Sequence, residues 1–324
     1  DTADEIMELT EASGADEVYQ MSGGDLIVLG CTIGEGAALA GSTLAEIGAT
    51  YEPDWSFLFG ALTRDGETVI PRGDQRLEVG DHVRVLTSRR SRNEILELLG
   101  AAHRRAKRVM VLGGGAVGSR VAERLEQAGS DVVLVEHDID RARVLAERLP
   151  RITVVRGDIE DTDMLSEESI DVKDLVIAAT GDDAANVLAC AFAATGRDTF
   201  TVAVIHRLSL LPLVRQFGID AALSPRTASA NAVLRHVRGG TASVATVLES
   251  DIEVDEIEIE VGSDADGAVV AELHLPHSIV LGAVIRPGEP GRIVRGYTVL
   301  NAGDNVVVFA RPESLPALRK VFTA

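Results

Sequence analysis

The middle of the chain alternates short apolar runs with longer segments whose apolar residues recur at helical spacing. The apolar runs predict strands at Arg108–Leu112, Asp131–Glu136, Ile152–Val155, Leu175–Ala179, Thr199–Ile205 and Asp220–Leu223. Apolar strands that alternate with amphipathic helices are typical of a parallel sheet with helices on both faces. Residues 104–225 therefore predict an α/β domain built on a doubly wound parallel sheet.

A second pattern lies on both sides of this region, because one small module occurs twice. Gly41–Ile47 matches Gly267–Leu273, and Gly60–Arg64 matches Gly282–Arg286. The later positions of the two copies also correspond in order: Gly73, Leu77, Gly80, Asp81, Val83 and Val85, against Gly296, Leu300, Gly303, Asp304, Val306 and Val308. An alternating strand over 251–261 and an apolar strand after each Gly-Asp turn predict two small α+β modules.

These patterns divide the chain into four parts. We expect the first module at 17–90, the α/β domain with a crossover helix at 104–240, and the second module at 247–324. Helical spacing at Arg226–Arg238 predicts the crossover helix, and Thr2–Ala12 stands in the corresponding place before the first module. Residues 1–16 are therefore expected to be the tail of a preceding domain of the same kind, most of which the sequence lacks.

Composition narrows the possible partners. Hydrophobic residues make up 46% and charged residues 25% of the 324 residues, as expected for a chain that folds throughout. The formal net charge of −20 opposes binding to nucleic acid or anionic lipid. No apolar stretch approaches the roughly 18 residues of a membrane span, so we expect a cytoplasmic protein without direct membrane insertion. Cys31 and Cys190, far apart, offer neither a disulfide framework nor a thiolate metal site.

A glycine-rich turn follows the first strand of the α/β domain. Gly-x-Gly-x-x-Gly lies directly after Arg108–Leu112 and directly before a helical run at Val117–Ala128. The first glycine permits a tight turn, the second lets the backbone approach a pyrophosphate, and the third lets helix and strand pack closely. The helix N-terminus offers free amides to the phosphates. We therefore predict a Rossmann dinucleotide site at Gly113, Gly114, Gly115, Ala116, Val117 and Gly118.

Glu136 ends the second strand, where an acidic side chain accepts hydrogen bonds from the adenosine ribose and repels a 2′-phosphate. This position favours NAD(H), ADP or ATP over NADP(H). Two alternatives remain open. The domain could be a Rossmann fold that binds no ligand, or Glu136 could serve only to cap the helix that begins near Asp138.

The carboxyl ends of the remaining strands carry further candidates, because ligands of open parallel sheets bind at that edge. Asp158 could contact adenine or ribose, or could cap the helix near Asp161. Thr180 and Gly181 are small enough to admit a cofactor, and His206 is either a ligand contact or a surface histidine. Asp182, Asp183 and Asn186 have the residue types of helix N-termini.

No catalytic or metal site follows from the remaining polar residues. His274 and His277 could suggest a metal pair, but Pro276 breaks any helix that would align both imidazoles. The seven histidines are scattered and show no spacing typical of Ser-His-Asp or Cys-His catalysis. We expect neither a bound metal nor an enzyme.

Several motifs together resemble the second half of the TrkA family, the regulatory subunits of Trk potassium uptake. They are Lys107–Gly118, Val135–Asp138, Gly157-Asp158, Ile177–Asp183 with Asn186, and Ser224-Pro225. The repeated module resembles the family's small C-terminal domain, called RCK-C or TrkA-C. The resemblance implies phosphates on Gly113–Val117, ribose on Glu136, adenine near Asp158, and further nucleotide contacts around Thr180 and His206.

The resemblance also implies a function and partners. It implies a cytoplasmic ring that senses nucleotides and gates a membrane potassium-translocating subunit of the TrkH/TrkG type. The predicted helices at 2–12 and 226–238 flank separate modules and could cross onto a neighbouring copy, so we expect a dimer or tetrameric ring. The departure from the family pattern is the absent first Rossmann domain, which leaves the stoichiometry of the ring open. One alternative is the gating ring of a ligand-gated potassium channel. Another is an NAD-dependent oxidoreductase, which would need an acid-base group at the nicotinamide.

Overall fold

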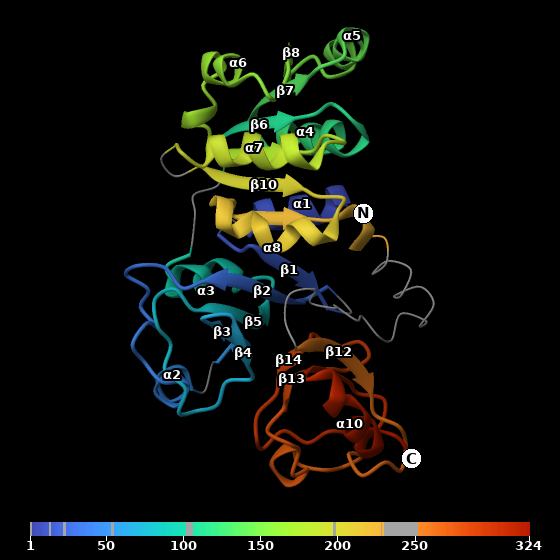
Figure 1. Ribbon diagram of the computed structural model, residues 1–324. Coiled ribbons are helices and arrows are strands. Elements are labelled where there is room, and N and C mark those ends of the chain that lie inside the picture. Colours follow the sequence, from blue (N-terminus) through green and yellow to red (C-terminus); the bar gives the residue numbers. More distant parts are fainter. Residues whose placement is uncertain are drawn as a thin grey trace. The chain divides into compact units, whose positions relative to one another are not determined.

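The computed structural model divides the chain into two compact units (Figure 1). The structure describes residues 2–12, 14–21, 24–52, 55–101, 106–196, 199–227, 229 and 252–324. One unit combines residues 1–16 with 103–230, and the other combines 17–102 with 231–324. The first unit therefore holds the α/β domain, and the second holds both small modules.

The first unit is built on a six-stranded parallel sheet in the order β11-β10-β9-β6-β7-β8. Each predicted strand is confirmed to within one residue at either end. The elements in chain order are α1 (Thr2–Glu11), β6 (Arg108–Leu112), α4 (Ala116–Gln127), β7 (Asp131–Glu136), α5 (Ile139–Arg148), β8 (Thr153–Arg156), α6 (Thr162–Glu167), β9 (Leu175–Ala178), α7 (Asp183–Ala193), β10 (Phe200–Val204), α8 (Leu211–Val214) and β11 (Ala221–Leu223).

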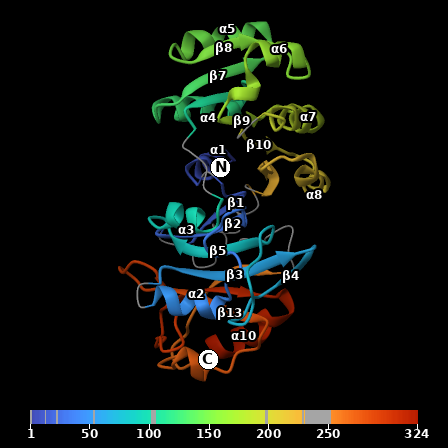
Figure 2. The same ribbon diagram turned by 90° about the vertical axis from the view of Figure 1, so that its left-hand side faces the viewer.

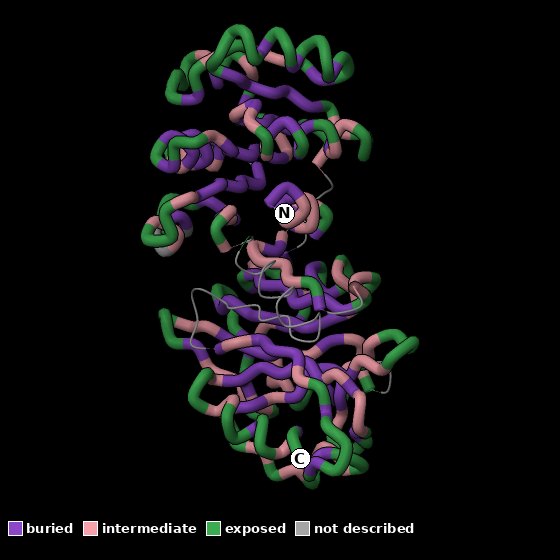
Figure 3. Tube along the Cα trace, turned by 90° about the vertical axis from the view of Figure 1, so that its right-hand side faces the viewer, coloured by how far each residue is buried: buried purple, intermediate pink, exposed green. Residues whose placement is uncertain are grey.

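Helices cover both faces of this sheet, as expected for a doubly wound fold. Figure 2 shows α4 and α7 on opposite sides, and α5 packs on β7 and β8 beside α4. The central strands are buried along nearly their whole length (Figure 3), which is why they are almost continuously apolar. The α7 face is filled by Ala185, Ala189 and Cys190 against sheet residues such as Met110 and Val176.

The N-terminal helix belongs to the same unit as the sheet. Ala3, Ile6 and Leu9 are buried on one side of α1, and the helix contacts α4 and β11. Asp4 of α1 pairs with Arg124 of α4 at 2.6 Å. The predicted crossover helix Arg226–Arg238 lies for the most part outside the described residues.

The second unit contains two antiparallel sheets, one from each module, in the orders β1-β2-β5-β3-β4 and β12-β15-β13-β14. The first module consists of β1 (Glu17–Gln20), β2 (Leu26–Thr32), α2 (Leu44–Tyr51), β3 (Phe57–Arg64), β4 (Glu67–Val69), β5 (His82–Ser88) and α3 (Arg92–Leu98). The second consists of β12 (Glu253–Glu258), β13 (Ile279–Ile285), β14 (Arg292–Ile293), β15 (Asn305–Ala310) and α10 (Leu315–Phe322).

The duplication extends to details of the backbone and of the ion pairs. Both copies shift register at the repeated glycine, between Phe59 and Ala61 in β3 and between Leu281 and Ala283 in β13. In the first module Arg64 binds the buried Asp81, whose Oδ2 also accepts the Glu78 amide. Likewise Arg286 binds the buried Asp304, which accepts the Asn301 amide. These bonds hold the Gly-Asp turn in both modules.

The strand β12 corrects one expectation from the pattern. A single alternating face was expected over 251–261, yet Asp255 and Glu256 are buried. The apolar positions change phase within the strand: Ile252 and Val254 join the core between the modules, while Ile257 and Ile259 join the core of their own module. Both faces of β12 are covered, because α10 also contacts it. The prediction of one buried and one exposed face is therefore wrong for this strand.

The two modules share a hydrophobic core. Gly60 of β3 faces the ring of Phe309, which is fully buried, and Gly282 of β13 faces Leu86. The first module contributes Met21, Leu26, Val28, Ala61 and Leu86, and the second contributes Ile252, Val254, Ala283, Val307 and Phe309. The repeated glycines therefore allow the two sheets to approach each other closely.

We predict that Gly60→Ala destabilises this unit, because the new methyl group would overlap the Phe309 ring. The expected loss in the free energy of unfolding is about 1–3 kcal/mol, the usual cost of overpacking a core. Urea denaturation measures it. Gly73→Ala is the matched control, since a Cβ there lies at an ordinary 3.6 Å from Ala45. Equal denaturation midpoints for the two variants would contradict the packing of the modules at Gly60.

Candidate nucleotide-binding site

The candidate site lies at the carboxyl edge of the parallel sheet, where the strand order reverses. The chain passes from β6 to β7 and β8 on one side, and β9, β10 and β11 lie on the other. Gly113 follows β6 with a φ of +104°, a conformation that favours glycine. A Cβ at Gly113 would lie 2.9 Å from the Ala179 oxygen and the Thr180 Cγ2. The glycine turn is therefore directly beside the end of β9.

The other two motif glycines have different surroundings. A Cβ on Gly118 would overlap the Gly113 carbonyl and contact Val111, so this glycine lets α4 pack against β6. A Cβ on Gly115 would have no protein atom within 4 Å. The fold itself does not require glycine at 115, and the space beside it is open to a ligand.

The N-terminus of α4 differs from those of the next three helices of the unit. Asp138, Asp161 and Asp182 cap α5, α6 and α7 by accepting hydrogen bonds from first-turn amides. In contrast, α4 begins at Gly115 with no side-chain cap and no acidic residue in its first turn. Its first amides and the positive end of its dipole are thus available to an anion.

Glu136 links the glycine turn to the end of β7. Its side chain is 8% exposed; Oε2 accepts the Gly114 amide and Oε1 accepts the Asp138 amide, both at 2.9 Å. The helix that follows is capped by Asp138 itself, so capping is not the role of Glu136. Each carboxylate oxygen keeps a second lone pair that can accept from a ribose hydroxyl. The structure therefore holds this carboxylate in a fixed position beside the turn.

Asp158 follows β8 and is exposed. Its Oδ1 accepts the Glu160 amide at 3.0 Å, which forms a turn, while Asp161 caps α6. The Oδ2 atom lies 3.9 Å from Nδ1 of His137. Asp158 is therefore not the helix cap, and one of its oxygens faces the imidazole that follows Glu136.

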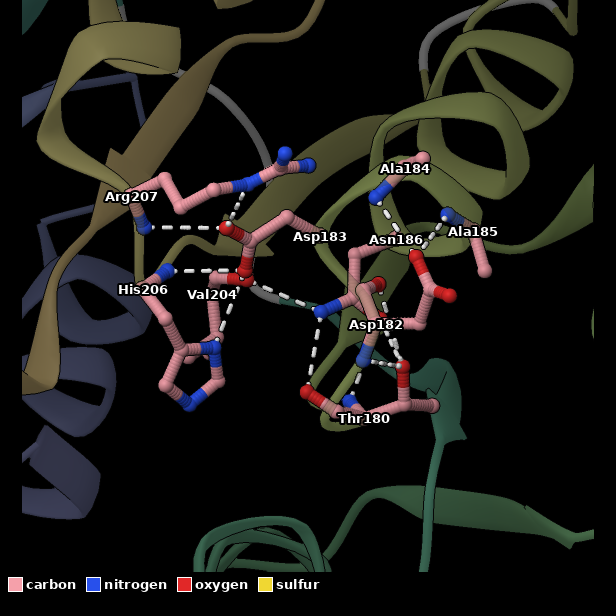
Figure 4. Close-up of polar contacts among 9 residues, drawn as sticks. All are labelled: Thr180, Asp182, Asp183, Ala184, Ala185, Asn186, Val204, His206 and Arg207. Carbon is pink, nitrogen blue, oxygen red and sulfur yellow. Dashed lines mark hydrogen bonds and ion pairs between the residues drawn. The ribbon is translucent and has the colours of Figure 1, made fainter.

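Thr180 and Asn186 form a small network after β9 (Figure 4). Asn186 is fully buried; its Oδ1 accepts from the Thr180 amide and hydroxyl, and its Nδ2 donates to the carbonyls of Thr180 and Val204. The ends of β9 and β10 are thereby joined through one amide side chain. Gly181 has open space where a Cβ would be.

Asp183 positions His206, and this role was not predicted. Sequence reasoning placed Asp182 and Asp183 among helix N-terminal residues, and the structure confirms this, with Asp182 as the cap and Asp183 as the first residue of α7. The carboxylate of Asp183 accepts the amides of His206 and Arg207, the His206 Nδ1 at 2.9 Å and the Arg207 Nε at 3.2 Å (Figure 4). A helix needs only one N-terminal cap. The second of two adjacent aspartates was therefore the sign in the sequence that Asp183 has another partner.

The same contacts set the charge of this group. Burial alone would raise the pKa of Asp183, but the hydrogen bonds from His206 and Arg207 outweigh it and lower the pKa to about 2. An ionised carboxylate only accepts hydrogen bonds, so the His206 Nδ1 carries a proton. The Nε2 atom of the half-exposed ring is then the position that is left for a ligand.

The two histidines considered as a metal pair and the cysteine of α7 make contacts within the fold. His274 has a φ of +47°, and its ring bonds the Glu272 carbonyl, while the His277 carbonyl accepts from Arg72. Burial raises the pKa of the Cys190 thiol to about 12, so the thiolate is not accessible near neutral pH. No helix among the described residues is long and apolar enough to cross a bilayer.

Comparison with known proteins agrees with this architecture. The profile of the TrkA-N domain matches residues 109–225, and that of the TrkA-C domain matches both 28–100 and 254–323. The solved RCK domain of GsuK aligns over 99% of this chain and 69% of that structure, with a TM-score of 0.52 at 16% identity. The GsuK channel aligns with a TM-score of 0.53 at 18% identity, covering 99% of this chain and 57% of that one. At these identities the likeness concerns the fold.

The fold and the domain matches define the class: a Rossmann-type TrkA-N domain combined with two TrkA-C modules. The Trk system potassium uptake protein TrkA of Haemophilus influenzae is 31% identical over 98% of this chain and 70% of its own length. TrkA of Halomonas elongata is 30% identical over 94% of this chain and 67% of its own length. The chain belongs to the TrkA family of potassium uptake proteins.

We predict that Asp183→Asn destabilises the first unit by about 2 kcal/mol near neutral pH, the equivalent of its pKa shift. Because the folded pKa is depressed, this contribution is present above about pH 4 and is lost as the pH falls toward about 2. Denaturation with urea at several pH values measures it.

Asp182→Asn is the control, since asparagine caps a helix as well as aspartate does. It should change stability by no more than about 0.5 kcal/mol. A difference between the two variants that persists unchanged at about pH 2 would contradict the ionised state assigned to Asp183.

Proposed function

We propose that this chain binds a dinucleotide at the carboxyl edge of its parallel sheet. The observation that carries the proposal is the uncapped N-terminus of α4, which begins at Gly115 beside open space. NAD(H) is the preferred ligand, with ADP and ATP as further candidates. A solved channel with the same fold, 17% identical and with a TM-score of 0.52, is described as bound to NAD.

Different candidate residues contact different parts of the dinucleotide in this proposal. The amides of Gly115, Ala116, Val117 and Gly118 bind the pyrophosphate at the start of α4. Gly113 and Gly114, whose own amides donate to Val135 and Glu136, form the turn that lets the pyrophosphate approach. Glu136 accepts from the adenosine ribose and disfavours a 2′-phosphate, because it is a buried acid next to that position. Asp158 is the candidate contact for the adenine, because it follows β8 at the same edge of the sheet. Thr180, Gly181 and His206 border the other half of the ligand, where Asp183 orients the imidazole.

As a member of the TrkA family the chain is a regulatory component of potassium uptake rather than an enzyme. We propose that it works in the cytoplasm at the inner face of the cell membrane, bound to a potassium-translocating subunit of the TrkH/TrkG type. It self-associates as a dimer or tetrameric ring. Nucleotides act by favouring one ring conformation over another, because a ligand shifts such an equilibrium only through its different affinities for the two states.

The alternatives are less well supported. A channel gating ring rests on fold likeness at 16–18% identity, whereas the relatives at 30–31% identity are named as Trk system proteins. An oxidoreductase would need an acid-base group at the nicotinamide. His206, whose Nδ1 is held by Asp183, is a candidate for such a group, but the relatives at 30–31% identity are named as potassium uptake proteins.

We predict that Gly115→Val abolishes nucleotide binding without unfolding the protein. NADH, NAD, ADP and ATP should raise the melting temperature of the original chain, and NADP should raise it less because of Glu136. The valine would occupy the space required by the pyrophosphate, while no protein atom lies there to be displaced. Differential scanning fluorimetry measures both effects.

Gly118→Val is the contrasting control. Its side chain would overlap the Gly113 carbonyl, so the unliganded protein should already be destabilised. Undiminished thermal shifts in Gly115→Val would refute the phosphate site, and equal shifts with NADP and NAD would refute the assignment of Glu136.

We predict that potassium flux through the reconstituted translocating subunit depends on which nucleotide saturates this protein. NADH, NAD, ADP and ATP share one site but should stabilise different ring conformations to different extents. Flux assays with each nucleotide in turn, with the Gly115→Val protein as the nucleotide-blind control, measure this dependence. Identical flux with every nucleotide, after binding of each has been verified, would rule out nucleotide sensing.

A further inference from the structure

The imidazole of His206 lies at the carboxyl edge of the parallel sheet, two strands away from the glycine turn. The strands at this place run in the order β6, β9 and β10, and His206 follows β10 as Thr180 follows β9. A Cβ on Gly113 would lie 2.9 Å from the Thr180 Cγ2, so the turn adjoins the end of β9. Neighbouring strands are about 4.8 Å apart, which puts the end of β10 roughly 10 Å from the turn.

The dinucleotide proposed above would extend along this row of strand ends. Its pyrophosphate lies at the start of α4, and its adenosine lies toward Glu136 at the end of β7. The second nucleoside therefore runs in the opposite direction, past Thr180 and toward His206. Its ribose comes first, beside the small residues after β9, and its base comes next. The place of His206 thus corresponds to the base of the second nucleoside, which is nicotinamide in NAD(H).

The His206 ring is both fixed and accessible. Its Nδ1 lies 2.9 Å from the Asp183 Oδ1, and the His206 amide donates to the same oxygen at 2.8 Å. The side chain of Asp183 is 4% exposed, whereas that of His206 is 41% exposed. Figure 4 shows the ring on the side of the carboxylate that faces away from the Arg207 guanidinium. The ring is therefore held in one orientation, and its Nε2 is directed away from Asp183.

The same carboxylate determines whether Nε2 donates or accepts. Burial alone would raise the pKa of Asp183, but the hydrogen bonds from His206 and Arg207 lower it to about 2, so the carboxylate is ionised near neutral pH. An ionised carboxylate only accepts hydrogen bonds, and the proton of a neutral imidazole is therefore on Nδ1. The Nε2 atom then carries a lone pair. His206 offers a hydrogen-bond acceptor to the ligand.

We propose that His206 selects a nicotinamide dinucleotide by accepting a hydrogen bond at Nε2 from the amino group of the carboxamide. This role rests on the nucleotide site proposed above and adds to it the group that distinguishes NAD(H) from ADP and ATP. A carboxamide presents a donor to the Nε2 lone pair, whereas a further phosphate presents only oxygens. Asp183 is the positioning residue, because it fixes both the direction of the ring and the nitrogen that carries the proton.

Four ligands that share the adenosine diphosphate part test this role. They are NAD, deamido-NAD, ADP-ribose and ADP, and the Kd of the full chain for each is measured by calorimetry at about pH 8.5, where an imidazole is ordinarily neutral. Deamido-NAD has a carboxylate in place of the carboxamide and therefore has no donor for Nε2. NAD should bind about tenfold or more tightly than deamido-NAD and ADP-ribose, as expected for the loss of one hydrogen bond.

Variants assign this preference to the imidazole. His206→Phe keeps a ring but removes the acceptor, so NAD should lose about tenfold in affinity while ADP stays within about twofold. His206→Gln, whose Oε1 can accept a hydrogen bond, should restore part of the preference for NAD. A merely structural role would instead weaken all four ligands alike. Arg207→Gln is the matched control, since it also removes a donor to Asp183 but from the other side of the carboxylate, and it should keep the preference.

Three results would overturn the role of His206 alone, provided that ADP binds: equal affinities for NAD and deamido-NAD, an unaltered preference in His206→Phe, or tighter binding of deamido-NAD than of NAD. The last result would show that Nε2 carries a proton. If His206→Phe does not fold, the ligand series on the original chain decides, because it requires no variant. Failure of both ADP and NAD to bind would refute the nucleotide site itself, and the role of His206 with it.

Discussion

Buried carboxylates that accept backbone amides determine where the important loops of this protein lie. Glu136 holds the glycine turn through the Gly114 amide, and Asp183 holds the segment after β10 through two amides. Asp81 and Asp304 do the same for the Gly-Asp turns of the modules. A carboxylate taken out of water is stable only when donors surround it, so each of these groups admits few loop conformations. The conformations of the glycine turn, of the segment after β10 and of the Gly-Asp turns follow from this constraint.

The same constraint explains where a very acidic chain leaves backbone amides open to an anion. Aspartates satisfy the N-termini of α5, α6 and α7, and Glu136 and Asp183 are already bound to the backbone or to basic groups. The amides at the start of α4 are left without such a side chain. Local pairing, rather than net charge, decides where an anion can bind.

Duplication has produced an internal pair of modules whose equivalent parts perform different tasks. The bulge at Gly60 and Gly282 and the pairs Arg64–Asp81 and Arg286–Asp304 are the same in both copies. Arg72 and Arg295, each directly before a repeated glycine, differ in their partners. Arg295 stacks on the indole of Trp55, whereas Arg72 donates to the carbonyl of His277. The residues that both modules share therefore maintain the packing of the two sheets. The residues that differ make the contact of Arg295 with the other module chemically different from that of Arg72.

The sequence by itself determined the strands of the α/β domain, the glycine turn with Glu136, and the duplicated module, because these features depend on local periodicity and on spacing within short segments. It did not reveal that Asp183 binds His206, that β12 is covered on both faces, or that Arg295 crosses to Trp55. Each of these contacts joins groups from different elements, the last between residues 240 positions apart. Only the tertiary structure decided them, since a side chain's partner depends on which strands and helices pack together.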